Sequence, residues 1–243
     1  MDVTKRILAI IPAYNEAKSI AAVIDNIRTS VPQADIIVVN DGSADTTENI
    51  AEAKGTIVLN LPYNMGIGGA VQTGYKFAAQ NGYDIAVQVD ADGQHPVNEI
   101  PRLVEAITNH EADMVIGSRY VEMSEKEASF TRAMGKWVLA KVITLLTGQR
   151  ITDSSSGFRV INQRVICLFS HRYPRDYPEP ESIALLIREG LRVKEIPVEM
   201  NGRTSGRSSI TMLKGIYYVI KVTLAILIDK FEPRVQLKEN KVR

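Results

Sequence analysis

Residues 84–96 read Asp-Ile-Ala-Val-Gln-Val-Asp-Ala-Asp-Gly-Gln-His-Pro, a strand-like apolar run that ends in an acidic loop. Asp90 and Asp92 lie two residues apart, and in extended backbone such side chains point to one side. Two carboxylates on one side repel each other unless a cation lies between them. A divalent metal bound to carboxylate and phosphate oxygens resolves this repulsion. The alternative is a solvated acidic turn in which Gly93 supplies a positive φ.

The segments around this run alternate between strand-like and helix-like patterns. In the first half we expect strands at residues 6–11, 35–39, 56–59, 84–89 and 113–116, the first ended by Pro12, and helices at 17–28, 46–53, 67–80 and 97–109. In the second half we expect helices at residues 131–146, 181–189 and 210–231, a strand at 191–198, and a loop that enters a short strand over 153–161. Continuous apolar strands joined by helices indicate an α/β fold with a mostly parallel sheet and helices on both faces. Such sheets carry their sites at the carboxyl ends of strands, where the polar motifs of this chain begin.

The bulk composition is that of a globular protein with one large domain or two small ones. Of the 243 residues, 45% are hydrophobic and 23% are charged, and the formal net charge of +1 argues against a nucleic-acid-binding protein. The single cysteine, Cys167, cannot form an intramolecular disulfide, which favours a cytoplasmic protein. We find no signal peptide and no run of the roughly 18–20 apolar residues that a spanning helix needs.

Three further polar motifs follow predicted strands or open predicted helices. After the first strand, Tyr14 can stack on a base, and Glu16 can bind a ligand or open the next helix. After the second strand, Asp41 can accept hydrogen bonds from a ribose or a base, and Asp45 can do the same or cap the next helix. The Gly-rich stretch 64–70 lacks the spacing of the dinucleotide fingerprint. It serves either close helix packing or close approach of the backbone to a ligand.

Taken together, these motifs resemble the family 2 inverting glycosyltransferases of the GT-A fold. The matching elements are residues 11–16, 40–43, 64–74 and 90–96, in the same order and at the same spacing. The second half resembles the branch of dolichyl- and undecaprenyl-phosphate sugar synthases. Its matching elements are residues 117–120, Arg132, residues 153–159, Arg203, Gly206 and Ser208. The resemblance implies a Rossmann-like GT-A sheet and an enzyme that transfers a sugar.

The resemblance also implies roles for individual residues. The nucleotide-sugar donor is expected to contact Pro12, Tyr14, Glu16, Asp41, Asn64, Gly69 and Asp90. A Mg²⁺ or Mn²⁺ ion is expected among Asp90, Asp92 and Gln94, and the acceptor phosphate at Arg119, Arg132, Arg203 and Ser208. The residues expected to act in catalysis are Asp92, Arg119 and Asp153, the last lying near the reacting phosphate or orienting it.

The implied reaction is transfer of a hexose from a UDP- or GDP-sugar to a polyprenyl phosphate, undecaprenyl or dolichyl phosphate, at the cytoplasmic face of a membrane. Arginines fit this chemistry because their planar guanidinium groups match phosphate oxygens. A phosphate acceptor is already ionised at neutral pH and needs no strong general base. The alternative acceptor, a sugar hydroxyl of a lipid-linked or cell-surface saccharide, needs a base, and the candidates are then Asp153, Glu179 and Glu181. The intact acidic cluster disfavours a non-catalytic nucleotide-sugar binder.

The last apolar segment has a helical pattern that suits a membrane surface. Residues 211–228 are apolar around most of a helical circumference, and Lys214 and Lys221 lie close to one face. A basic amphipathic helix of this kind can lie in the lipid headgroup layer. The alternatives are a helix of the core and a protein–protein contact, which includes a homo-oligomer interface.

These patterns divide the chain into a catalytic unit, residues 1–209, and a C-terminal segment, residues 210–243, that faces a membrane or a partner. Within the catalytic unit we expect residues 1–120 to bind the donor and residues 121–209 to bind the acceptor. Many members of the resembled branch carry transmembrane helices after the catalytic domain, whereas this chain ends at Arg243. Either such helices are lacking here, or a small membrane-anchor protein supplies them as a partner.

Overall fold

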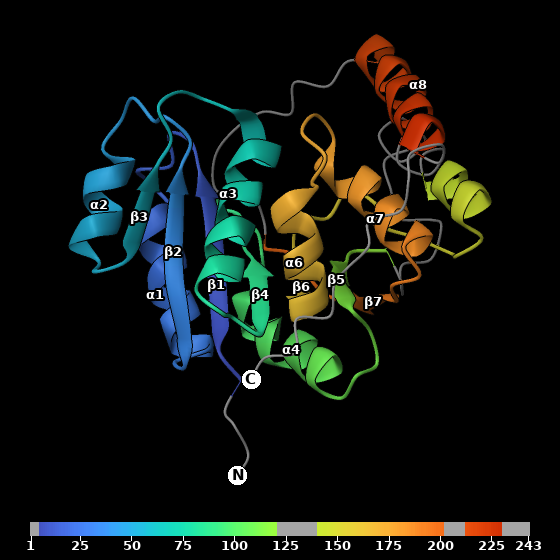
Figure 1. Cartoon of the computed structure of the whole chain (residues 1–243). Coiled ribbons are helices and arrows are strands. Elements are labelled where there is room, and N and C mark those ends of the chain that lie inside the picture. Colours follow the sequence, from blue (N-terminus) through green and yellow to red (C-terminus); the bar gives the residue numbers. More distant parts are fainter. Residues whose placement is uncertain (1–4, 121–139, 202–211, 230–243) are drawn as a thin grey trace.

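The computed structural model describes residues 5–120, 140–201 and 212–229, with the side chains of the last segment described over 219–228. Within these residues the centre is a seven-stranded sheet with helices on both faces (Figure 1). The strands are β1 (Ile7–Ala13), β2 (Ala34–Asn40), β3 (Ile57–Asn60), β4 (Ile85–Gln88), β5 (Met114–Ser118), β6 (Arg159–Asn162) and β7 (Val193–Pro197). Their order is β3-β2-β1-β4-β6-β5-β7, and of these seven β6 is antiparallel to its two neighbours. The mostly parallel α/β sheet predicted from the sequence is confirmed.

The helices cover the sheet because alternate side chains of the strands point to opposite faces. They are α1 (Ile20–Ser30), α2 (Thr47–Ala53), α3 (Gly66–Gln80), a 3₁₀ turn (Val97–Glu99), α4 (Ile100–Thr108), a helix over 140–147, α6 (Gln163–His171), α7 (Pro178–Arg188) and α8 (Met212–Asp229). On β1, Leu8 and Ile10 join the core cluster under α3, α6, α7 and α8. Ile7, Ala9 and Ile11 join the cluster under α1 and α4 on the other face.

Two expectations about regular structure were wrong. We expected the first strand to end at Pro12, but β1 continues to Ala13, with Pro12 opposite Val39 of β2. The proline is tolerated because β4 pairs with β1 only as far as Ile10, so that side of β1 needs no further N–H donor. Helix α6 was not expected at all. Asn162 caps it by accepting a hydrogen bond from the backbone N–H of Val165 at 3.1 Å.

Some expected boundaries moved by a few residues, and one expected helix is only partly described. Helix α1 begins at Ile20 rather than at residue 17, because Glu16 O accepts hydrogen bonds from Ser19 N and Ile20 N in a turn before the helix. The expected helix over 131–146 lies partly outside the described residues. The part that the structure describes is helical over 140–147.

Helix α3 packs closely on its neighbours through glycines of the Gly-rich stretch. A Cβ added to Gly74 would lie 2.3 Å from Cγ2 of Ile10 on β1, and one added to Gly68 would lie 2.4 Å from the carbonyl oxygen of Arg175. Such distances are far below van der Waals contact, so these positions require glycine for the helix to lie where it does. Close helix packing is therefore one function of this stretch.

Helix α8 packs one face against the body of the protein and exposes the other. Val222 and Ile226 are buried in the core cluster that α7 shares. Large apolar side chains of the other face are exposed, namely Ile220, Leu224, Leu227 and Ile228. None of the helices in the described part of the chain has the length and apolar character needed to span a bilayer.

Candidate active site

The loops that follow β1, β2, β4 and β5 lie at one edge of the sheet, because these strands run parallel and end there. They carry four of the residues singled out from the sequence, Tyr14, Asp41, Asp90 and Arg119. The strand ends of a doubly covered α/β sheet are its usual ligand-binding edge.

Asp90, just after β4, is held in place by His95 of the same loop. The backbone N–H of Asp90 donates to Nδ1 of His95 at 3.0 Å, and Nε2 of His95 lies 3.4 Å from Oδ2 of Asp90. Because Nδ1 accepts a hydrogen bond, the neutral imidazole carries its proton on Nε2, facing the carboxylate. His95 is buried, and its ring packs at 5.0 Å from the ring of Phe158. His95 therefore fixes both the backbone and the side chain of Asp90.

The second carboxylate oxygen of Asp90 has an incomplete environment. Oδ1 is buried, and it has no hydrogen-bond partner among the described residues. The backbone of Gly157 closes over this carboxylate, since a Cβ added there would lie 3.2 Å from Oδ1 and 3.1 Å from Oδ2. A buried acceptor without a partner costs folding free energy, on the order of 1–3 kcal/mol. Such an atom fits a cation ligand, because a cation supplies the missing partner.

Asp92 and Gln94 contact each other in the turn that follows. Oδ1 of Asp92 accepts from the backbone N–H of Gln94 at 3.0 Å, and Oδ2 accepts from the side-chain amide of Gln94. Gly93 adopts φ +77°, which closes the turn. The three predicted metal ligands thus share one loop, with Asp90 against His95 and Asp92 against Gln94. No group of three or more His, Cys, Asp or Glu side chains forms a metal-binding cluster in the described parts of the chain.

Arg119 and Asp153 form a two-pronged ion pair beside this loop. Nε of Arg119 donates to Oδ2 of Asp153, and Nη2 donates to Oδ1, both at 2.7 Å. The backbone N–H of Arg119 donates to the same Oδ2 at 3.1 Å. Asp153 is 1% exposed and Arg119 is 29% exposed, so the pair is sunk into the protein with one edge outward. The two residues were predicted separately as catalytic, and the structure brings them together.

The outward edge of Arg119 is available to a ligand. Nη2 also donates to Oγ of Ser155 at 2.9 Å, whereas Nη1 has no hydrogen-bond partner among the described residues. Burial lowers the pKa of Arg119, but the hydrogen bond and the charge of Asp153 outweigh it and raise that pKa above the ordinary value. The group therefore stays a cation. A guanidinium fixed by one carboxylate and open at Nη1 can accept an anionic ligand such as a phosphate.

Asp41 is occupied in the structure by the start of α3. Its Oδ1 accepts from the backbone N–H of Met65 at 2.7 Å, and its Oδ2 accepts from that of Gly66 at 3.0 Å. Oδ1 of Asn64 accepts from the same N–H of Gly66 at 3.0 Å. Both side chains thus satisfy the amino end of the helix, and their contact with a nucleotide stays a prediction. Asp45 also acts locally, accepting from the backbone N–H of Thr47 at 3.0 Å.

The remaining predicted donor residues surround the end of β1. Tyr14 is 48% exposed at this edge, which leaves its ring available for stacking. Glu16 accepts from Oγ of Ser19 at 2.8 Å at the entrance to α1. Pro12 is buried within β1, and Gly69 is buried in α3 against Met65. Three of the predicted phosphate contacts, Arg132, Arg203 and Ser208, lie outside the described residues.

A buried arginine beneath the site, Arg159, was not among the functional residues predicted from the sequence. Arg159, at the start of β6, is 1% exposed and donates to Ser156 O at 2.8 Å, to Oγ of Ser182 at 2.6 Å and to Glu179 O at 2.8 Å. Burial raises the pKa of Glu179, although the charge of Arg159 opposes this, and the charge of Asp90 raises it further. Arg159 stands opposite Gln88 of β4 in the sheet. A charged residue inside an otherwise apolar strand was the available signal.

Comparison with known proteins shows which family the chain belongs to. The family model described as "Glycosyl transferase family 2" matches residues 8–169 of this chain. The undecaprenyl-phosphate mannosyltransferase of Micrococcus luteus is 32% identical over 215 residues, which cover 85% of this chain and 88% of that protein. The UDP-N-acetylglucosamine–dolichyl-phosphate N-acetylglucosaminyltransferase of Methanococcus voltae is 35% identical over 215 residues, 80% of this chain and 85% of that one.

A solved structure shares the fold. The crystal structure of glucosyl-3-phosphoglycerate synthase from Mycobacterium tuberculosis, in complex with Mn²⁺, uridine diphosphate and phosphoglyceric acid, aligns with a TM-score of 0.71 and 21% identity. The alignment covers 93% of this chain and 78% of that one. The GT-A fold predicted from the motifs is thereby confirmed. With the matched region running from β1 to α6 across the acidic loop of Asp90 and the Arg119–Asp153 pair, the chain belongs to glycosyl transferase family 2.

Proposed function

We propose that the enzyme moves a hexose from a UDP- or GDP-sugar to a polyprenyl phosphate, with inversion at the sugar and with a divalent metal. The observation that carries the proposal is a pair of polar atoms, at the carboxyl ends of the strands, that lack hydrogen-bond partners among the described residues. Among the described residues, Oδ1 of Asp90 is buried without a hydrogen-bond partner, and Nη1 of Arg119 has none either. The carboxylate oxygen of Asp90 suits a cation, and the guanidinium nitrogen of Arg119 suits an anion. The names of the two relatives, which act on undecaprenyl and dolichyl phosphate, support this choice of acceptor.

The donor end is the loop after β4. Asp90, Asp92 and Gln94 would hold Mg²⁺ or Mn²⁺, which when bound neutralises the diphosphate that leaves the sugar. Two protein carboxylates are sufficient, because Mg²⁺ is usually held by one or two carboxylates together with substrate phosphates and water. The related structure that contains Mn²⁺ and uridine diphosphate supports a metal of this kind. The donor contacts at Pro12, Tyr14, Glu16, Asp41, Asn64 and Gly69 are part of the proposal.

The acceptor end is Arg119, held by Asp153. An acceptor phosphate would accept a hydrogen bond from Nη1 and be positioned with one oxygen toward the anomeric carbon of the donor. That oxygen is already negatively charged at neutral pH, so the protein needs only to bind and orient it. Arg132, Arg203 and Ser208 are proposed to contact the same phosphate. Asp153 orients Arg119 and needs to remove no proton from the acceptor.

An alternative acceptor is a sugar hydroxyl, which requires a general base. Glu179 gives this alternative its support, because it is half-buried and burial raises its pKa toward the range that suits a base. Product chemistry separates the two acceptors. A glycosyl phosphate is cleaved by mild acid, whereas a glycoside of a saccharide is much more resistant.

The proposal predicts a metal-dependent lipid product. The purified enzyme is incubated with UDP- and GDP-hexoses, Mg²⁺ or Mn²⁺, and undecaprenyl phosphate in detergent, and the lipid fraction is analysed by mass spectrometry. We expect one donor to give a hexosyl prenyl phosphate that mild acid releases and that chelation of the metal prevents. An acid-stable glycoside, or no transfer to prenyl phosphates from any donor, would contradict the proposal.

We further propose that the enzyme works on the cytoplasmic face of a membrane, with residues 1–209 as the catalytic unit and residues 210–243 as the membrane-facing segment. Helix α8 lies on the opposite side of the molecule from β3 (Figure 1). The side chains of Ile220, Leu224, Leu227 and Ile228 on this helix are exposed. Lys221 sits on the same helix, bound to Asp176 at 2.6 Å. A small membrane-anchor protein and a second copy of the chain are further partners that could cover this face.

This surface predicts binding to lipid vesicles. We expect Leu224→Glu to weaken co-sedimentation with phosphatidylglycerol vesicles by about tenfold, because it removes an apolar side chain that lipid would bury. The matched control is Ile57→Glu on β3, which is similarly exposed at 50% against 54% for Leu224. The control should bind vesicles like the unmodified enzyme. Equal binding of the Leu224 variant and the unmodified enzyme would exclude this face as the membrane contact.

A further inference from the structure

A carboxylate of β7, that of Glu195, accepts hydrogen bonds from the loop that carries Asp153. Oε1 of Glu195 accepts from the backbone N–H of Asp153 at 2.6 Å, and Oε2 accepts from the backbone N–H of Thr152 at 2.8 Å. The hydroxyl of Thr152 donates to the same Oε2 at 3.0 Å and lies 3.1 Å from Oγ of Ser118. Both oxygens of Glu195 are thus used on one short stretch of backbone.

This carboxylate lies where β7 runs beside β5, the strand that leads into Arg119. Glu195 pairs with Ile116 in the parallel register of these strands. Its neighbour Lys194 points the other way and pairs with Glu111 at the surface. Glu195 is half-buried, and a carboxylate in such a place is stable only when donors satisfy it. Three N–H and O–H donors do so here.

These contacts form a relay from β7 to the proposed phosphate contact. Glu195 fixes the backbone at Asp153, the Asp153 carboxylate fixes Nε and Nη2 of Arg119, and Nη1 has no hydrogen-bond partner among the described residues. Residues 152–157 of this loop form no helix or strand, so no regular backbone hydrogen bonding fixes the loop. We infer that Glu195 is a positioning residue for sugar transfer, which acts through Asp153 to aim Arg119 at the acceptor phosphate.

The substitution Glu195→Gln tests this role at constant size. A glutamine offers one acceptor oxygen, and its amide NH₂ would face a backbone N–H of residue 152 or 153, so the two-oxygen hold on the loop is lost. The matched control is Lys194→Gln on the adjacent surface position. Because the role rests on the proposed function, one readout must be independent of sugar transfer.

The independent readout is the rate at which phenylglyoxal modifies Arg119, followed by peptide mass spectrometry. We expect Glu195→Gln to raise this rate by about tenfold, because the pair with Asp153 opens more often when its loop is released. Lys194→Gln should leave the rate unchanged. An unchanged rate in Glu195→Gln would overturn the inference, whether or not the enzyme transfers sugar.

The kinetic readout separates a positioning role from a general loss of stability. With undecaprenyl phosphate as acceptor, Glu195→Gln should lower kcat/KM for the acceptor by on the order of 100-fold, while the KM for the donor stays within about twofold. If that variant fails to fold, Thr152→Val removes the hydroxyl contacts with Glu195 and Ser118 and keeps the backbone contacts, and it should show the same acceptor-specific loss at about tenfold. Equal losses toward donor and acceptor, with a lower unfolding temperature, would contradict the inference. Faster labelling of Arg119 in an enzyme that makes no glycosyl phosphate would leave the relay standing and refute the proposed function alone.

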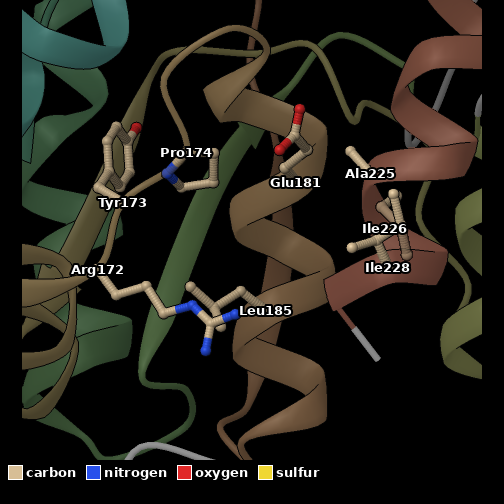
Figure 2. Close-up of a pocket in the computed structure, with 8 residues that line it drawn as sticks. All are labelled: Arg172, Tyr173, Pro174, Glu181, Leu185, Ala225, Ile226 and Ile228. Atoms are coloured by element: carbon tan, nitrogen blue, oxygen red, sulfur yellow. The ribbon is translucent and has the colours of Figure 1, made fainter. Parts of the chain in front are cut away.

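A cavity lies between α7 and α8. It has a volume of about 290 Å³ and is lined by Arg172, Tyr173, Pro174, Glu181, Leu185, Ala225, Ile226 and Ile228 (Figure 2). Its lining combines the guanidinium of Arg172 and the carboxylate of Glu181 with apolar side chains, a mixture that does not point to one class of ligand.

Discussion

Asp90→Asn is expected to lower kcat for sugar transfer by about 100- to 1000-fold, because it removes a charged side chain from the proposed metal site at the leaving diphosphate. The asparagine keeps the size of the side chain, and its amide oxygen can still accept from Nε2 of His95, which lies 3.4 Å from Oδ2 in the unmodified protein. The measurement is steady-state transfer at saturating Mg²⁺ or Mn²⁺. Asp92→Ala is expected to have the same effect for the same reason.

The folded state should not suffer from this change. Oδ1 of Asp90 is a buried acceptor without a partner among the described residues, so replacing this atom breaks no hydrogen bond with them. We expect the free energy of unfolding of Asp90→Asn to be equal to that of the unmodified protein or higher by about 1 kcal/mol. The control is Asp84→Asn at the opposite end of β4, where Asp84 accepts from the backbone N–H of Arg6 at 2.9 Å. That variant should retain activity within about twofold. Metal-dependent turnover by Asp90→Asn at the normal rate would refute the assignment.

Arg119→Lys is expected to damage both acceptor use and stability. Lysine keeps the positive charge but offers a single donor group, so it cannot bind both oxygens of Asp153 and also present an outward N–H. We expect kcat/KM for the prenyl phosphate to fall by about 100-fold, with the KM for the donor unchanged. The free energy of unfolding should fall by about 1–3 kcal/mol, because one hydrogen bond to the 1% exposed carboxylate of Asp153 is lost.

The matched control for this change is Arg102→Lys. Arg102 is 55% exposed and lies 3.4 Å from Glu99 one turn away on the surface, where ion pairs contribute little. Urea unfolding should give this variant the stability of the unmodified protein within about 0.5 kcal/mol, and its kinetics should be unchanged. If Arg119→Lys were as stable and as active as Arg102→Lys, the Arg119–Asp153 pair would have no part in acceptor binding.

Much of the fold could be read from the sequence because its signals are local. Each strand of the first half is an apolar run, and each following helix has periodic apolar positions. One error arose where a neighbouring strand decides the outcome. Pro12 suggested the end of the strand. Only the pairing of β1 with β4, which extends no further than Ile10, shows why a proline fits within β1. Helix α6 was missed although the sequence contains a local signal for it, an Asn162 cap before a short apolar run.

The candidate site was predictable as residue types and much less as contacts. The acidic loop of Asp90 could be read because its residues are consecutive. The pairing of Arg119 with Asp153 joins residues 34 positions apart, and the hold of Glu195 on Asp153 spans 42 positions. Spacing alone does not indicate such contacts, because the order of strands β6, β5 and β7 creates them. The same applies to Asp41, whose carboxylate meets the start of α3 24 residues later.

We propose that Asp90 binds the metal on the donor diphosphate while Arg119 binds the acceptor phosphate in the same site. The most direct measurement is a crystal structure with Mn²⁺, uridine diphosphate and farnesyl phosphate, with the manganese located by its anomalous scattering. The account predicts an anomalous peak at coordination distance, about 2.0–2.6 Å, from Oδ1 of Asp90 and a farnesyl phosphate oxygen hydrogen-bonded to Nη1 of Arg119. A manganese peak away from both Asp90 and Asp92, or a prenyl phosphate bound elsewhere with Nη1 facing solvent, would contradict it.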